Sequence, residues 1–166
     1  MAKLKFKGEI DMVERFEKFA FVISNAYRYI QRIETEAMEK YGLKGAYVQY
    51  MIVIHNNPDG VTATKLSEIA DRNKAAVSRA LAEMEEKGII YRNKEKNYYR
   101  ARIFLTDEGE KAMQYIIDKA KKAVKIADIG LEEKKRDEFY DSLGIITANL
   151  RRIIDEGLLE KEYEEK

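Results

Sequence analysis

The sequence predicts a mainly α-helical fold with one small β-hairpin. Apolar residues recur at steps of three and four over residues 10–41, which is the period of one buried face of a long helix. The same period returns at 113–127 and at 139–153. Between these helices, segments 89–92 and 99–105 are rich in β-branched and aromatic residues and flank a polar loop, which indicates a hairpin.

Composition limits what the chain can do. With 166 residues and 45% hydrophobic residues, it can bury the core of one domain. It has no cysteine, which excludes disulfides, thiolate catalysis and cysteine-type zinc sites. No stretch approaches the roughly 18 apolar residues of a membrane span, and the start does not resemble a signal peptide. We therefore expect a cytoplasmic protein with no membrane partner.

The first helix, at 10–41, carries one long apolar stripe. Its members are Ile10, Val13, Phe16, Phe19, Ile23, Tyr27, Ile30, Ile33 and Ala37. Gly42 and Gly45 interrupt the pattern, and residues 46–57 are then apolar nearly all round. A strand is one reading of 46–57, but its length and setting favour a buried helix.

A short helix and a longer one follow, joined by a turn. Thr62 or Thr64 can cap the short helix, whose Leu66 and Ile69 are expected to face inward. Asn73 is a good N-cap for the next helix, at 74–87. That helix buries Val77, Ala80, Leu81 and Met84, and Gly88 supplies the left-handed cap that ends it.

Two helices complete the chain after the hairpin. Thr106 opens the first, with Asp107 and Glu108 favourably placed at its N-terminus. The pattern breaks near Gly130 and restarts. The last apolar stripe, heptad-like in spacing, consists of Phe139, Leu143, Ile146, Leu150 and Ile153.

This order is that of a winged helix-turn-helix lobe flanked by helices. We predict three regions within a single structural domain: an N-terminal dimerisation helix at 1–45, the winged lobe at 46–105 and C-terminal dimerisation helices at 106–166. The stripes of the first and last helices are too long for the central lobe to cover, so pairing of two chains is favoured. The alternative is a helical bundle within one chain.

The charge distribution points to nucleic acid. The net charge is +1, but residues 60–105 carry ten Lys or Arg against six Asp or Glu, whereas 131–166 carry seven against eleven. A helix that enters the major groove must be slim and carry donors at its start. The candidate DNA-binding residues of the helix and its turn are Thr62, Thr64, Arg72, Asn73, Lys74, Ala75, Ala76, Ser78 and Arg79.

The second half of the same helix is acidic, with Glu83, Glu85 and Glu86. Phosphates would repel these carboxylates, so Glu83 and Glu86 are expected where the helix leaves the groove. A surface helix whose charges are merely solvated is the competing reading. That reading leaves the capped turn before the helix and the hairpin after it unexplained, because neither is needed for a solvated surface helix.

The hairpin is a candidate wing. Its DNA-binding candidates are Arg92, Lys94, Lys96 and Arg100, with only Glu95 opposing them. A basic hairpin can lie along the DNA backbone and place a side chain in the minor groove. Lysines on a hairpin can equally protect its edge against pairing with another chain.

The segments "TKLSEIADRNKAAVSRALAEMEEKGII" and "LTDEGEKAM" resemble the MarR family of winged-helix transcriptional regulators in order and spacing. The resemblance is specific over residues 62–113. It implies a homodimer that binds a pseudo-palindromic operator in double-stranded DNA, in many members as a repressor released by a small, often aromatic and anionic, effector. Ligand-binding residues are not predicted.

Two features depart from the family pattern. Many members carry an Asp-x-Arg pair in the wing, whereas Asn97 and Tyr99 stand at the matching positions here. Members that sense oxidants use a cysteine, which this chain lacks.

Other functions have weaker support in the sequence. A winged-helix module for protein–protein contact is the main alternative, permitted by the modest net charge. An enzyme is disfavoured, since the chain has one histidine and no Gly-rich phosphate loop. We expect no cofactor and no metal, because His55 would have only carboxylate partners. A packed or helix-capping histidine is the more ordinary reading of His55, with a pH or ligand role as the alternative.

Overall fold

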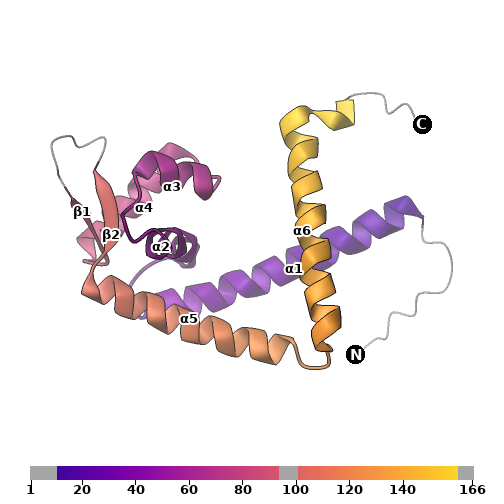
Figure 1. The fold of residues 1–166 in the computed structure, drawn as a ribbon, viewed down its shortest axis with the longest axis horizontal. Coiled ribbons are helices and arrows are strands. Elements are labelled where there is room, and N and C mark those ends of the chain that lie inside the picture. The colour runs from indigo at the N-terminus through magenta and orange to yellow at the C-terminus, as the bar shows by residue number, and fades with distance from the viewer. Residues whose placement is uncertain (1–10, 94–100, 161–166) are drawn as a thin grey trace. The chain divides into compact units, whose positions relative to one another are not determined.

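A computed structural model describes residues 11–93 and 101–160 (Figure 1). The elements follow in the order α1 (Met12–Glu39), η1 (Gly45–Tyr47), α2 (Val48–His55), α3 (Ala63–Ile69), α4 (Lys74–Glu86), β1 (Ile90–Asn93), β2 (Arg102–Leu105), α5 (Asp107–Ala127), α6 (Glu133–Glu156) and η3 (Leu158–Glu160). The predicted fold class, mainly α with a small hairpin, is confirmed. Of the predicted segment 46–57, residues 46–55 are helical, in η1 and α2, and not a strand; the helix ends at His55, two residues before the predicted end.

The chain divides into two compact units, Met1–Ala120 and Lys121–Lys166. The first unit contains α1 together with the lobe predicted at 46–105. The dimerisation roles assigned to 1–45 and 106–166 stay predictions. None of the described helices combines the length and apolar character that crossing a bilayer requires.

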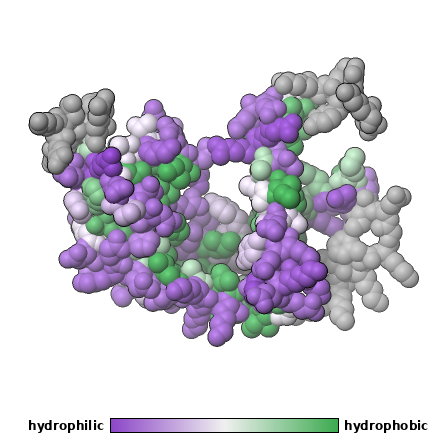
Figure 2. Space-filling model, viewed as in Figure 1, coloured by the Kyte–Doolittle hydropathy of each residue, from purple (hydrophilic) through white to green (hydrophobic). Residues whose placement is uncertain are grey.

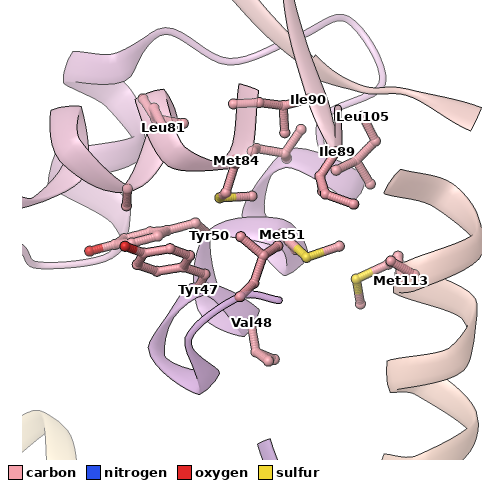
Figure 3. Close-up of a cluster of buried hydrophobic side chains, with 14 of the residues drawn as sticks. Tyr47, Val48, Tyr50, Met51, Leu81, Met84, Ile89, Ile90, Leu105 and Met113 are labelled. Atoms are coloured by element: carbon pink, nitrogen blue, oxygen red, sulfur yellow. The ribbon is translucent and has the colours of Figure 1, made fainter. Parts of the chain in front are cut away.

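The core of the first unit lies where the end of α1, α2, α4, the hairpin and α5 meet (Figure 3). Its fully buried side chains are Met38, Met51, Leu66, Val77, Leu81, Met84, Ile89, Ile90 and Ile103. Each such side chain contributes roughly 1.5–3 kcal/mol through its removal from water. This burial anchors the inner face of α4 and leaves its other face to solvent.

Side-chain caps define the turn before α4. The Oγ1 of Thr62, rather than that of Thr64, accepts a hydrogen bond from the backbone N–H of Lys65 at 3.2 Å. The Oδ1 of Asn73 accepts from the N–H of Ala75 at 2.7 Å. The N-cap predicted at Asn73 is confirmed, and each cap satisfies an amide that the first helical turn leaves unpaired.

The inward face of α3 differs from the prediction. Ile69 is 47% exposed, whereas Ser67 is buried. The buried or half-buried stripe, at helical spacing, consists of Ala63, Leu66, Ser67 and Ala70. The Ser67 hydroxyl donates to the carbonyl of Arg72 at 2.6 Å, so its burial leaves no polar group unpaired. Leu66 is fully buried as predicted, so only Ile69 was placed wrongly.

The hairpin is antiparallel, with Ile90 opposite Leu105 and Asn93 opposite Arg102. Val61 extends this small sheet, because its backbone exchanges two hydrogen bonds with Ile103 at 2.9 and 3.2 Å. β1 is as long as the predicted segment 89–92 but lies one residue further along the chain, and β2 begins at Arg102, within the predicted segment 99–105. Residues 94–100 lie outside the described residues.

A tight corner joins the end of α4 to the start of α5. The Thr106 hydroxyl donates to the carbonyl of Gly88 at 2.6 Å and accepts from the N–H of Gly109 at 3.0 Å. The first turn of α5 lies so close to the start of β1 that a Cβ on Gly109 would be 2.1 Å from the carbonyl oxygen of Ile89. The Thr-x-x-Gly spacing of "LTDEG" thus has a steric cause.

We expect Gly109→Ala to lower the free energy of unfolding by roughly 1–3 kcal/mol, because the added methyl group overlaps backbone that cannot move easily. Gly144→Ala is the matched control, since a Cβ there meets nothing within 4 Å. That variant should gain up to about 1 kcal/mol from helix propensity alone. Urea denaturation of both variants measures the difference, and a stabilised Gly109→Ala would contradict the steric argument.

Candidate nucleic-acid interface

The N-terminal half of α4 presents a slim, basic and exposed face. Arg72 and Asn73 precede the helix and are exposed, as are the side chains that the helix itself contributes. Those exposed side chains are Lys74, Ala75, Ser78 and Arg79, with Ala76 half-buried. Val77, Ala80 and Leu81 are buried on the opposite side, as predicted. Most of the predicted helix residues are thus exposed on the face of α4 opposite its buried side chains. α4 lies next to α3 (Figure 1).

The two threonines at the start of α3 differ in their availability. The Thr62 hydroxyl is half-buried and already serves as the cap of α3, whereas Thr64 is exposed. The oxygen of the Asn73 carboxamide is likewise occupied by its capping bond, which leaves the amide N–H groups available for another acceptor.

The acidic half of α4 holds partners within its own chain, which the sequence did not reveal. The Tyr47 hydroxyl donates to Oε2 of Glu83 at 2.6 Å, and the Lys44 ammonium lies 3.2 Å from the same oxygen. Two residues further on, Glu85 accepts a hydrogen bond from Nε of Arg92 at 2.9 Å. Glu83 is therefore linked to the segment after α1, and Glu85 to the base of the wing.

These contacts set the charge states of the cluster formed by Lys44, Tyr47 and Glu83. The Tyr47 hydroxyl, and after it the Lys44 ammonium, lowers the pKa of Glu83 below its ordinary value. Burial, reinforced by the carboxylate of Glu83, raises the pKa of Tyr47. Hydrogen bonding to Glu83 and then to Tyr47 raises the pKa of Lys44. At neutral pH the cluster holds a carboxylate, a neutral phenol and an ammonium.

We expect Tyr47→Phe to raise the pKa of Glu83 toward its ordinary value, because the variant loses the main donor to the carboxylate. Carboxyl-carbon NMR titration measures this shift directly. With the folded-state pKa depressed, the stabilisation is complete above the ordinary value of 4.5 and is lost as the pH falls through the folded-state pKa. An unchanged Glu83 titration in Tyr47→Phe would contradict this assignment.

The wing residues fall into two groups. Arg92 lies on β1, and its side chain is only 12% exposed because it pairs with Glu85. Its role as a DNA contact stays a prediction, while its observed contact supports the base of the hairpin. Lys94, Lys96 and Arg100 lie outside the described residues. Arg102 on β2 donates to the carbonyl of Asp59 at 2.7 Å, which links the hairpin to the turn before α3.

His55 is the last residue of α2. Its Nδ1 lies 3.0 Å from a carboxylate oxygen of Glu110, so the imidazole joins α2 to α5. Within the part of the chain that the structure describes, no three His, Asp or Glu side chains are grouped in a way that could hold a metal ion.

These features define a winged helix-turn-helix protein, with an exposed basic helix start as its candidate interface. Residues 41–97 match the sequence model of the MarR family. A MarR transcriptional regulator from Methanosarcina mazei Go1 has a similar structure, with a TM-score of 0.72 and 25% identity over 82% of this chain and 99% of that chain. A comparison with curated protein sequences gave no match.

Two other solved structures share the fold at lower identity. A MarR protein from Peptoclostridium difficile has a TM-score of 0.74 at 15% identity, covering 92% of this chain and 96% of that one. A MarR-family regulator from Listeria monocytogenes, in complex with a 26-mer DNA, has a TM-score of 0.70 at 21% identity, covering 89% and 97%. The resemblance to the MarR family is therefore confirmed. This family and its fold are those of transcriptional regulators rather than enzymes.

Proposed function

We propose that this protein is a homodimeric transcriptional regulator that binds a pseudo-palindromic operator in double-stranded DNA and acts as a repressor. The observation that carries the proposal is the exposed, basic start of α4, presented by a winged helix-turn-helix fold. The Listeria structure, whose fold is similar, is a complex with DNA, which supports the same use of the fold here.

In this proposal the helix at 74–87 enters the major groove with its N-terminal end first. Arg79 offers a planar set of donors that can pair with a guanine edge, and Ser78 can reach a base or a phosphate. Ala75 and Ala76 keep the helix slim enough for close approach. Lys74 and the free amides at the helix start attract phosphate. Arg72, Thr62 and Thr64 flank this end as further backbone contacts.

The wing supplies the second set of contacts. Lys94, Lys96 and Arg100 are proposed to lie along the DNA backbone, where lysines provide charge without base preference. Arg92 is proposed to join them at the base of the wing. Its pairing with Glu85 makes its contribution smaller than that of an exposed arginine.

The proposed homodimer rests on apolar surface that the described residues do not cover. Phe16 of α1 is 66% exposed, and Val13, Val22 and Ile30 are also exposed. None of the residues of α6, all of which the structure describes, is buried. Apolar side chains lie at the surface of this helix (Figure 2). Such long apolar faces are typical of subunit interfaces.

We expect wild-type protein to sediment as a dimer at micromolar concentration and Leu150→Asp to sediment as a monomer. Leu150 lies on the exposed apolar stripe of α6, so a carboxylate there would be buried by pairing at a large cost. Asn149→Asp, at the adjacent exposed position of the same helix, adds the same charge and should remain dimeric. A stable wild-type monomer would contradict the proposed dimer.

Regulation by an effector is the remaining part of the proposal. We infer a small molecule, aromatic and anionic in class, whose binding releases the operator. The support for this is the confirmed resemblance to the MarR family, and we assign no residues to the effector. A repressor acts where the chromosome lies, so the proposed location is the cytoplasm.

The test of DNA binding is selection of genomic fragments by the full chain, followed by titration of a selected duplex at several salt concentrations. Counterion release predicts that the logarithm of the binding constant falls linearly with the logarithm of the salt concentration. If no fragment is retained at moderate salt, the fold would instead serve protein–protein contact, and the proposed function would be rejected.

We expect Arg79→Ala to weaken binding of the selected duplex by about 1–3 kcal/mol and to reduce discrimination at one base position. Arg79→Lys is the matched control, since it keeps the charge but loses the planar donor pair. It should keep most of the affinity for unrelated duplex while losing the same discrimination. Equal weakening on every duplex by Arg79→Ala, with specificity unchanged, would make Arg79 a phosphate contact.

A further inference from the structure

The short helix η1 is pressed against α1 by a close backbone contact. A Cβ on Gly45 would lie 2.6 Å from Oγ1 and 2.7 Å from the backbone N of Thr35. No side chain fits in that space, so the backbone of η1 contacts the backbone of α1 directly. Thr35 is itself held in α1, where its hydroxyl donates to the carbonyl of Gln31 at 2.8 Å.

The same short helix also holds the recognition helix. Tyr47, two residues after Gly45, is only 8% exposed, and its hydroxyl donates to Oε2 of Glu83 on α4 at 2.6 Å. Lys44, on the other side of Gly45, reaches the same carboxylate oxygen at 3.2 Å. A continuous chain of contacts therefore runs from Thr35 of α1 through η1 to Glu83.

We propose that η1 is a coupling element, and that Tyr47 and Glu83 are positioning residues that set the angle of α4 relative to α1. A polar contact suits this role because a hydrogen bond has a required direction, whereas apolar packing tolerates rotation and sliding. If two chains pair through α1, the angle of each α4 to its own α1 sets the separation of the two recognition helices. This last consequence rests on the proposed function, whereas the coupling itself does not.

The competing explanation is that Tyr47 only fills space in the core. Its ring lies next to that of Tyr50, with centroids 6.1 Å apart, and both hydroxyl groups point to the same side (Figure 3). Among the described residues, the Tyr50 hydroxyl makes no hydrogen bond. Tyr50→Phe therefore makes the same chemical change in the same cluster without removing a contact to α4.

Spin-label distances in the full chain test the coupling without DNA. The chain has no cysteine, so Arg32→Cys on α1 and Glu86→Cys on α4 introduce unique labelling sites at exposed positions. Labelled chains mixed with excess unlabelled chains report the distance within one chain. We expect one narrow distance distribution in the background protein and in Tyr50→Phe, and a clearly broadened or shifted one in Tyr47→Phe.

A second variant keeps the test decisive if Tyr47→Phe is poorly folded. Glu83→Ala removes the acceptor of both Tyr47 and Lys44 and leaves the Tyr47 ring packed, so it should broaden the distribution at least as much. Because Glu83→Ala already removes the contact that Tyr47→Phe breaks, the double variant should be no broader than Glu83→Ala alone. Distributions in Tyr47→Phe and Glu83→Ala that match those of Tyr50→Phe would overturn the proposal.

The consequence for DNA is tested with the duplex selected by the wild-type protein and with the same duplex carrying one extra base pair between its half-sites. Wild type and Tyr50→Phe should favour the original spacing. Tyr47→Phe should bind the original duplex about three- to tenfold more weakly and discriminate less between the two spacings. Unchanged spacing preference in Tyr47→Phe would overturn this consequence. Failure of wild type to bind any duplex would reject the proposed function, while the spin-label result would still decide the coupling.

Discussion

The close approach between the first turn of α5 and the carbonyl of Ile89 fixes how α5 packs against the hairpin and the end of α4. With Gly109 at this point the two backbones can touch, and the Thr106 hydroxyl then closes the corner by donating to Gly88. The segment between α4 and β1 lies at this corner, so the C-terminal end of α4, the start of the hairpin and the first turn of α5 are in direct contact.

The uneven charge of α4 follows from how its two halves are held. Asn73 caps the basic half, which otherwise keeps its side chains exposed. Within the acidic half, Glu83 contacts η1 and Glu85 contacts Arg92 at the start of the wing. Carboxylates are suited to this work because they accept charge-assisted hydrogen bonds from tyrosine and arginine. The acidic residues are thus engaged within the chain, whereas the side chains of the basic half stay exposed.

What could be predicted from the sequence was local. Asn73 and Gly88 were identifiable as the ends of α4 because caps depend on neighbouring residues, and the helical period located the elements. Ile69 was misplaced, since the inward face of α3 depends on the bond from Ser67 to Arg72. The partnership of Tyr47 and Glu83 joins residues 36 positions apart, and no local pattern encodes it. The role of Gly109 likewise depends on a backbone that only tertiary packing brings near.

The exposed faces of α1 and α6 complete the physical argument about assembly. None of the residues of α6 is buried, and isolated helices are marginal in water and depend on packing of an apolar face. If α6 pairs with a second copy, dimerisation stabilises the folded helix. The fraction of chains in which α6 is folded then rises with protein concentration. Affinity for the operator would then also depend on protein concentration, since two half-sites need two recognition helices. DNA binding through the basic start of α4 would then depend on pairing through the apolar stripe of α6.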